Sequence, residues 1–163
     1  MNNDFSIIIS GNNANVLAEI KSCNEVTKKY GLTLTDEQIA ELADGRQKAL
    51  RDTDRIEFSG GILKKLILAF CDSPYLTQEN YLETMYDLQE AFYFFKNESY
   101  DMISDDEMIE HMRTYFDGYA QGATEYIIGT SLEELCRYAK FGEEDEKEED
   151  PGDFYEGDYD DYR

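Results

Sequence analysis

The sequence contains no tryptophan, only two prolines and only one histidine among its 163 residues. Its three cysteines, Cys23, Cys71 and Cys136, are far apart and form no C-x-x-C pair. A disulfide framework or a zinc site is therefore not expected, and buried, reduced thiols are the simplest interpretation. The shortage of proline, together with many Leu, Ile, Glu and Lys residues, favours helix over sheet.

Basic residues are also scarce, since 15 Lys and Arg face 37 Asp and Glu, for a formal net charge of −22. Residues 141–163 carry 12 acidic and 2 basic side chains, so this short segment holds nearly half of the net charge. A surface this acidic repels nucleic-acid phosphates and anionic lipid headgroups. We expect no direct nucleic-acid binding and no membrane binding, whereas basic partners or cations would suit such a surface.

Long hydrophobic runs are missing as well. The N-terminus, "MNNDFSIIISGNN", has no basic region and only three consecutive aliphatic residues, too few for a signal or a membrane span. We therefore predict a cytoplasmic protein. Hydrophobic residues make up 41% of the chain, which is enough for one domain with a core. We predict a helical domain over residues 1–142 and a disordered acidic tail over residues 143–163, where apolar residues are too few to fold.

Capping boxes mark several helix starts. At three predicted helix starts a Ser or Thr is followed three residues later by Glu or Gln: Thr35 with Gln38, Ser104 with Glu107, and Ser131 with Glu134. This spacing satisfies two backbone donors at a helix start. With Thr77 as a further start, we predict six helices: 14–30, 35–53, 61–72, 77–98, 104–117 and 123–139, the last with a break at Gly129.

These elements predict an all-α fold, a compact bundle of about six helices. The helix at 61–72 is apolar around most of its circumference, which favours a central, mostly buried position. Two short apolar runs, Phe5 to Ile9 and Ile56 to Phe58, must either pair with each other as a minor two-stranded β element or stay irregular.

The chain resembles a known family in several segments. The longest runs from "RIEFSGGILKK" through "FCDSPYLTQENY" to "AFYFFKNES", and two shorter ones, "SDDEMIEHM" and "SLEELCR", follow it. That family is an uncharacterised group of small helical cytosolic proteins from clostridia-type Gram-positive bacteria. The likeness covers roughly residues 30–138, and "GGIL…FCDSPYLTQENY" is its most specific part. The resemblance implies no assigned activity, so it supplies no catalytic residue and no cofactor.

Four consecutive aromatic residues, Phe92 to Phe95, cover most of the circumference of the predicted helix 77–98. Some of these rings fill the core face, but Tyr86, Tyr93 and Phe94 fall outside it. A second helix of the same domain could cover them, or a homodimer or protein partner could. We predict these three residues as a protein contact patch and leave both kinds of cover open.

Carboxylates are frequent enough to suggest a metal site. Helical nucleotide pyrophosphohydrolases use E-x-x-E followed downstream by E-x-x-D, and three acid pairs here have one of these spacings: Glu41/Asp44, Glu98/Asp101 and Glu107/Glu110. Their order is reversed, and such pairs arise by chance in so acidic a chain. Glu-x-x-His, typical of di-iron bundles, does not occur. We predict no metal, no cofactor and no catalytic residue.

The few cations are concentrated before the apolar helix. Lys48, Arg51 and Arg55 share one helix face, and Ser59, Gly60 and Gly61 follow at the next helix start. These six residues form a candidate anion-binding site, and the alternative is that the cations pair with nearby acids.

Arg46 differs from these three cations, because it interrupts the apolar stripe of its helix. We predict that it makes a structural salt bridge to another helix.

Together these features favour a non-enzymatic protein-interaction module. The first alternative is a Mg²⁺- or Mn²⁺-dependent hydrolase of nucleotides or phosphates. The second is an acidic decoy of a DNA-binding protein, suggested by tail aromatics interleaved with acids: Phe154, Tyr155, Tyr159 and Tyr162.

Overall fold

Two predicted capping residues begin long helices in the computed structural model, which describes residues 14–57, 61–129 and 131–148. The hydroxyl of Thr35 accepts a hydrogen bond from the Gln38 amide, and the Gln38 side chain accepts one from the Thr35 amide. This capping box starts α3, Asp36–Thr53. Ser104 caps α6, Asp105–Asp117, by accepting a hydrogen bond of 3.2 Å from the Glu107 amide.

The predicted boundaries of two other helices, 77–98 and 14–30, were wrong. Helix α5 spans Tyr81–Glu98 and begins after Asn80, not at Thr77, because the Asn80 side chain accepts a hydrogen bond from the Thr77 amide and closes a turn there. The predicted helix 14–30 is divided into a helical segment at 14–22, α2 (Asn24–Thr27) and the 3₁₀ helix η1 (Lys28–Tyr30).

The predicted break at Gly129 is confirmed. The segment holds the 3₁₀ helix η2, Thr124–Tyr126, and then α7, Ser131–Glu148, while Gly129 adopts a left-handed φ of 91° between them. Helix α7 continues past the predicted domain boundary at residue 142. Residues 149–163 of the predicted tail lie outside the described residues.

The fold is an all-helical bundle, as predicted, and residues 14–57, 61–129 and 131–148 contain no strand. Of the two runs considered for a β element, Phe5 to Ile9 lies outside these ranges. Ile56 and Glu57 have irregular backbone, and Phe58 is not described. The described segment between α3 and α4 is thus a connection without regular structure.

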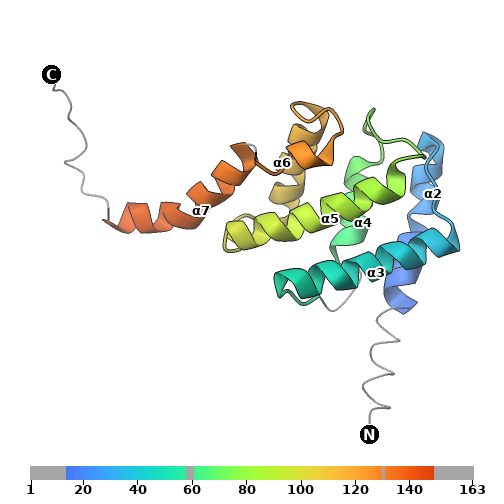
Figure 1. Ribbon diagram of the computed structural model, residues 1–163, viewed down its shortest axis with the longest axis horizontal. Helices are drawn as coiled ribbons and strands as arrows, with labels where there is room; N and C mark the ends of the chain where they lie inside the picture. Colours follow the sequence, from blue (N-terminus) through green and yellow to red (C-terminus); the bar gives the residue numbers. More distant parts are fainter. Residues whose placement is uncertain (1–13, 58–60, 130, 149–163) are drawn as a thin grey trace, which may run out of the picture.

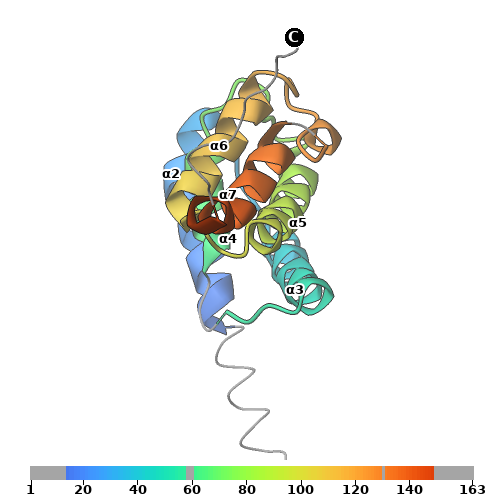
Figure 2. The ribbon, with the colours of Figure 1, turned by 90° about the vertical axis from the view of Figure 1, so that its left-hand side faces the viewer.

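Helix α5 lies at the centre of the bundle. It packs against α3, α4, α6 and α7, and its contact with α3 is the most extensive between any two helices (Figures 1 and 2). Helix α4, Ile62–Phe70, is the helix that the sequence placed at the centre. It buries Ile62, Leu63, Leu66, Ile67 and Phe70, but leaves Leu68 38% exposed, so one side of α4 faces the surface.

The core is built mainly from aliphatic and aromatic side chains of the helical segment at 14–22 and of α3, α4, α5, α6 and α7. Beyond the core, α7 extends past the ends of the other helices in Figure 1. No helix in the described part of the chain has the length and apolar character needed to cross a bilayer.

Candidate functional site

The predicted aromatic patch is mostly covered by the molecule itself. Tyr93 is only 1% exposed, and its ring meets Phe92 edge to face at a centroid distance of 5.6 Å. Tyr86 and Phe94 are half-buried against the same core. Tyr93 is therefore not a surface contact residue, because α3 packs along this flank of α5 and supplies the cover within the domain.

Tyr86 joins α5 to α3 at a position where α3 carries glycine. The Tyr86 hydroxyl donates a hydrogen bond of 2.8 Å to the Glu41 carbonyl. A Cβ atom at Gly45 would lie 2.1 Å from Cε1 of the Tyr86 ring. The glycine thus makes room for the ring and allows the two helices to approach closely.

We predict that Gly45→Ala lowers the free energy of unfolding by about 1–2 kcal/mol. Alanine gains about 1 kcal/mol in helix propensity, but forcing the Tyr86 ring aside costs more, up to about 3 kcal/mol. In a Tyr86→Ala background the same Gly45→Ala change should become stabilising, because the clash is gone. Urea denaturation of the four proteins measures both effects, and an unchanged sign in the two backgrounds would contradict the steric explanation.

The cations of the predicted anion site point to different partners. Lys48 pairs with Asp52 at 2.8 Å, and Arg55 pairs with Asp101 at 2.7 Å. The Arg55 guanidinium, hydrogen-bonded to Asp101, holds the pKa of that carboxyl below its usual range. Arg51 is exposed and forms no ion pair within the described ranges.

Of the remaining residues of that site, the structure describes only Gly61. Gly61 precedes α4 with a φ of 57° and offers no side-chain cap, while Ser59 and Gly60 lie outside the described residues. Lys48 and Arg55 each pair with an acidic side chain, which is the alternative considered for these cations. Anion binding at these six positions stays a prediction.

Arg46 is buried and paired, as predicted, but Glu57, its ion-pair partner among the described residues, is not on another helix. Its Nε donates to the Glu57 carboxylate at 3.1 Å, and its Nη2 donates to the Glu57 backbone carbonyl at 3.3 Å. Glu57 lies in the connection between α3 and α4, so this pair ties the connection to α3. Burial, with the nearby Glu57 carboxylate as a second cause, raises the pKa of the Tyr93 hydroxyl.

The acid pairs singled out in the sequence do not converge. Within the described ranges no group of three or more His, Cys, Asp or Glu side chains could hold a metal ion. The lone His111 has Nε2 3.8 Å from the Glu107 carboxylate, one turn before it. All three cysteines are buried and free, and burial raises the pKa of Cys23 and Cys136 to about 11, so the neutral thiol is favoured.

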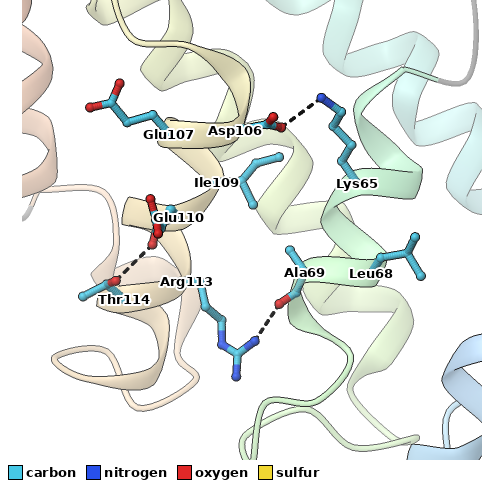
Figure 3. Close-up of a pocket in the computed structure, with 9 residues that line it drawn as sticks. All are labelled: Lys65, Leu68, Ala69, Asp106, Glu107, Ile109, Glu110, Arg113 and Thr114. Carbon is cyan, nitrogen blue, oxygen red and sulfur yellow. Dashed lines mark hydrogen bonds and ion pairs between the residues drawn. The ribbon is translucent and has the colours of Figure 1, made fainter.

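The structure also has a largely apolar groove between α4 and α6, which the sequence did not predict. It has a volume of about 770 Å³ (Figure 3). Ile109 and Ala69 form its floor between the two helices. Leu68 also lines the groove, and its side chain extends from the outer edge of α4, on the side away from α6 in Figure 3. The only signal in the sequence was that Leu68 falls outside the stripe formed by the other apolar residues of α4.

Two interactions across the helices bound this groove (Figure 3). At one end Lys65 pairs with Asp106 at 2.9 Å. At the other end Arg113 donates hydrogen bonds to the Ala69 carbonyl at 2.6 Å, to Asp72 and to Asp117. The Arg113 hydrogen bond lowers the pKa of Asp72, which favours the ionised form of that carboxyl. Both cations of the groove are therefore already occupied.

The acids on the α6 edge of the groove are less engaged. The Glu110 carboxylate has no partner among the described residues, and Glu107 has only the His111 contact at 3.8 Å. In Figure 3 both carboxylates lie on the side of α6 away from α4. The groove thus combines an apolar floor, closed ends and an acidic rim.

A family model matches most of the chain. DUF6323, a family of unknown function, matches residues 19–145, which is most of the chain, and the chain belongs to this family. No curated protein and no solved structure matches it. The resemblance to an uncharacterised family, expected from the "GGIL…FCDSPYLTQENY" segment, is confirmed at that level, and the family carries no assigned activity.

Proposed function

We propose that this member of a family of unknown function is a non-enzymatic protein-interaction module that binds a partner in the groove between α4 and α6. The observation that carries the proposal is the groove itself, about 770 Å³ in volume, with Leu68 38% exposed at its edge. Concave apolar surfaces with a few polar groups at the rim are typical binding sites.

The charged groups of the groove support binding more than catalysis. Lys65 pairs with Asp106 across α4 and α6. Arg113 pairs with Asp117 of its own helix and with Asp72, just after α4, so both cations have a structural role. The lining contains no histidine and no cysteine, and its one hydroxyl, on Thr114, donates to the Glu110 carbonyl at 3.0 Å. We include a cytoplasmic location in the proposal, because free, buried thiols suit a reducing compartment.

The test is site-specific photo-cross-linking in cells of the native host. A benzophenone amino acid replaces Leu68 in one version of the full chain and Ile56 in the control. Ile56 is a suitable control because it is a 77% exposed aliphatic residue on the α3–α4 connection. We expect a discrete covalent adduct from position 68 and not from position 56.

The cross-linked protein is then identified and purified. Its affinity for the full chain should fall about tenfold or more with Leu68→Asp and stay near wild type with Ile56→Asp, measured by calorimetry. An adduct with a second copy of the chain would assign the groove to a homodimer, the other form of protein contact expected from the sequence. The same adducts from both positions, or none, would contradict the proposal.

A further inference from the structure

We infer that the partner segment is a cationic amphipathic helix, which lays aliphatic side chains over Leu68, Ala69 and Ile109 and directs Lys or Arg toward Glu107 and Glu110. This inference rests on the proposed function and adds the chemistry of the partner. It depends on the shape of the groove and on which of its charges are already paired.

The shape fits a short helix. The groove follows α6 from Asp106 to Arg113, a length of roughly 10 Å at 1.5 Å per residue. Two turns of a helix present apolar side chains at i, i+3, i+4 and i+7 over that length. The Lys65–Asp106 and Arg113–Ala69 interactions close the two ends, so the apolar contact is confined to the space between them (Figure 3).

The charged side chains that line the groove favour a positively charged partner. Lys65 and Arg113 already have carboxylate partners, so neither is available to attract an acidic segment. The Glu110 carboxylate has no partner in the described part of the chain, and Glu107 has only a long contact with His111. Unpaired rim charges steer association and discriminate between partners. An approaching Lys or Arg is therefore favoured and an approaching carboxylate is repelled.

The same reasoning disfavours the chain itself as the occupant. Residues 149–163 are strongly acidic, with the same sign as the rim, and a second copy brings a formal charge of −22. Both would add like charges beside Glu107 and Glu110. A basic segment of another protein is the occupant that complements the groove.

The probe is a fluorescent peptide of about 18 residues, long enough to form a helix, built from Leu and Lys at amphipathic spacing. Its counterpart replaces every Lys with Glu. We expect the full-length protein to bind the Lys peptide, in fluorescence anisotropy, at least about tenfold more tightly than the Glu peptide, with affinity falling as salt rises.

Leu68→Asp separates groove binding from diffuse attraction to an acidic protein. The substitution adds a negative charge, so diffuse attraction of the Lys peptide would rise, whereas groove binding should fall by about tenfold. Ile56→Asp makes the same change in charge at an exposed site outside the groove and should not weaken binding. Circular dichroism checks the folding of each variant, and Leu68→Gln replaces Leu68→Asp if the latter does not fold.

The rim is tested with Glu107→Gln/Glu110→Gln, which should weaken the Lys peptide about three- to tenfold and flatten the salt dependence. The control, Glu41→Gln/Glu83→Gln, removes two exposed charges elsewhere and should have a smaller effect. Equal effects of the two double variants, or undiminished binding with Leu68→Asp, would overturn the inference. A cross-linked partner whose groove-binding segment is neutral or acidic would also overturn the inference but leave the proposed function intact. The absence of any adduct from position 68 would contradict both the inference and the proposed function.

Discussion

Replacing Arg46 with methionine is expected to lower the free energy of unfolding by about 3 kcal/mol. Arg46 is only 2% exposed and donates to both the carboxylate and the backbone carbonyl of Glu57. Removing one partner of a buried ion pair costs about 3–5 kcal/mol, because the other charge is left without compensation. The Glu57 side chain keeps 20% exposure, which allows partial hydration and places the expected cost at the lower end. Urea denaturation monitored by circular dichroism measures this difference.

Arg51→Met is the matched control. Arg51 lies on the same helix, is exposed, and forms no ion pair within the described ranges, so its replacement should change the unfolding free energy by less than about 0.5 kcal/mol. The double variant Arg46→Met/Glu57→Gln should recover part of the loss, because it leaves no unpaired carboxylate. A loss with Arg46→Met no larger than that with Arg51→Met would show that the pair is not a buried structural element.

This ion pair also bears on the proposed binding site. Glu57 lies in the connection that leads into α4, and a Cβ at Gly61, just before the helix, would lie 2.3 Å from the Glu57 carboxylate. Arg46, Glu57 and Gly61 thus fix where α4 begins relative to α3. Since α4 carries Leu68 and Ala69, the pair helps to set the geometry of the groove although it lies outside it.

Local signals in the sequence located the helices that have their own caps. Thr35 and Ser104 each satisfy backbone donors within three residues, so the information is contained in a few neighbouring positions. Thr77 has similar chemistry, but its amide donates to the Asn80 side chain in a turn, and α5 begins only after Asn80, which makes no side-chain capping hydrogen bond. Two candidate N-cap residues three positions apart cannot be ranked by spacing alone, which is why the start of α5 was predicted too early.

Arg46 could be recognised from the sequence because a cation inside an apolar stripe must be paired or reach solvent. Its partner could not be recognised, because Glu57 is one of many acids and lies in a connection without periodicity. The groove could not be predicted from the sequence for a related reason. Leu68, Ile109 and Arg113 become one surface only when α4 and α6 lie side by side, and helical periodicity assigns faces without assigning neighbours.

The aromatic run of α5 is a further case in which the sequence assigns a helix face but not the neighbour that covers it. One of its residues, Tyr93, carries the second large expected effect on stability. Replacing Tyr93 with alanine is expected to lower the free energy of unfolding by about 3–5 kcal/mol, the usual cost of removing a buried aromatic ring. Tyr93 is 1% exposed under α3, so its loss creates an internal cavity. Thermal or urea denaturation measures the cost. The oligomeric state, measured by light scattering after size exclusion, should not change.

Tyr93→Phe separates the ring from its hydroxyl. The Tyr93 hydroxyl is buried and has no hydrogen-bond partner among the described residues, although the Glu57 carboxylate is near enough to contribute to its raised pKa. Because no described residue accepts a hydrogen bond from this hydroxyl, its removal should leave stability unchanged within about 0.5 kcal/mol or raise it slightly. A contact residue would behave in the opposite way, since Tyr93→Ala would then spare stability and alter self-association. The pair of substitutions therefore decides whether this ring serves the core, as its burial indicates, or an interface, as the sequence allowed.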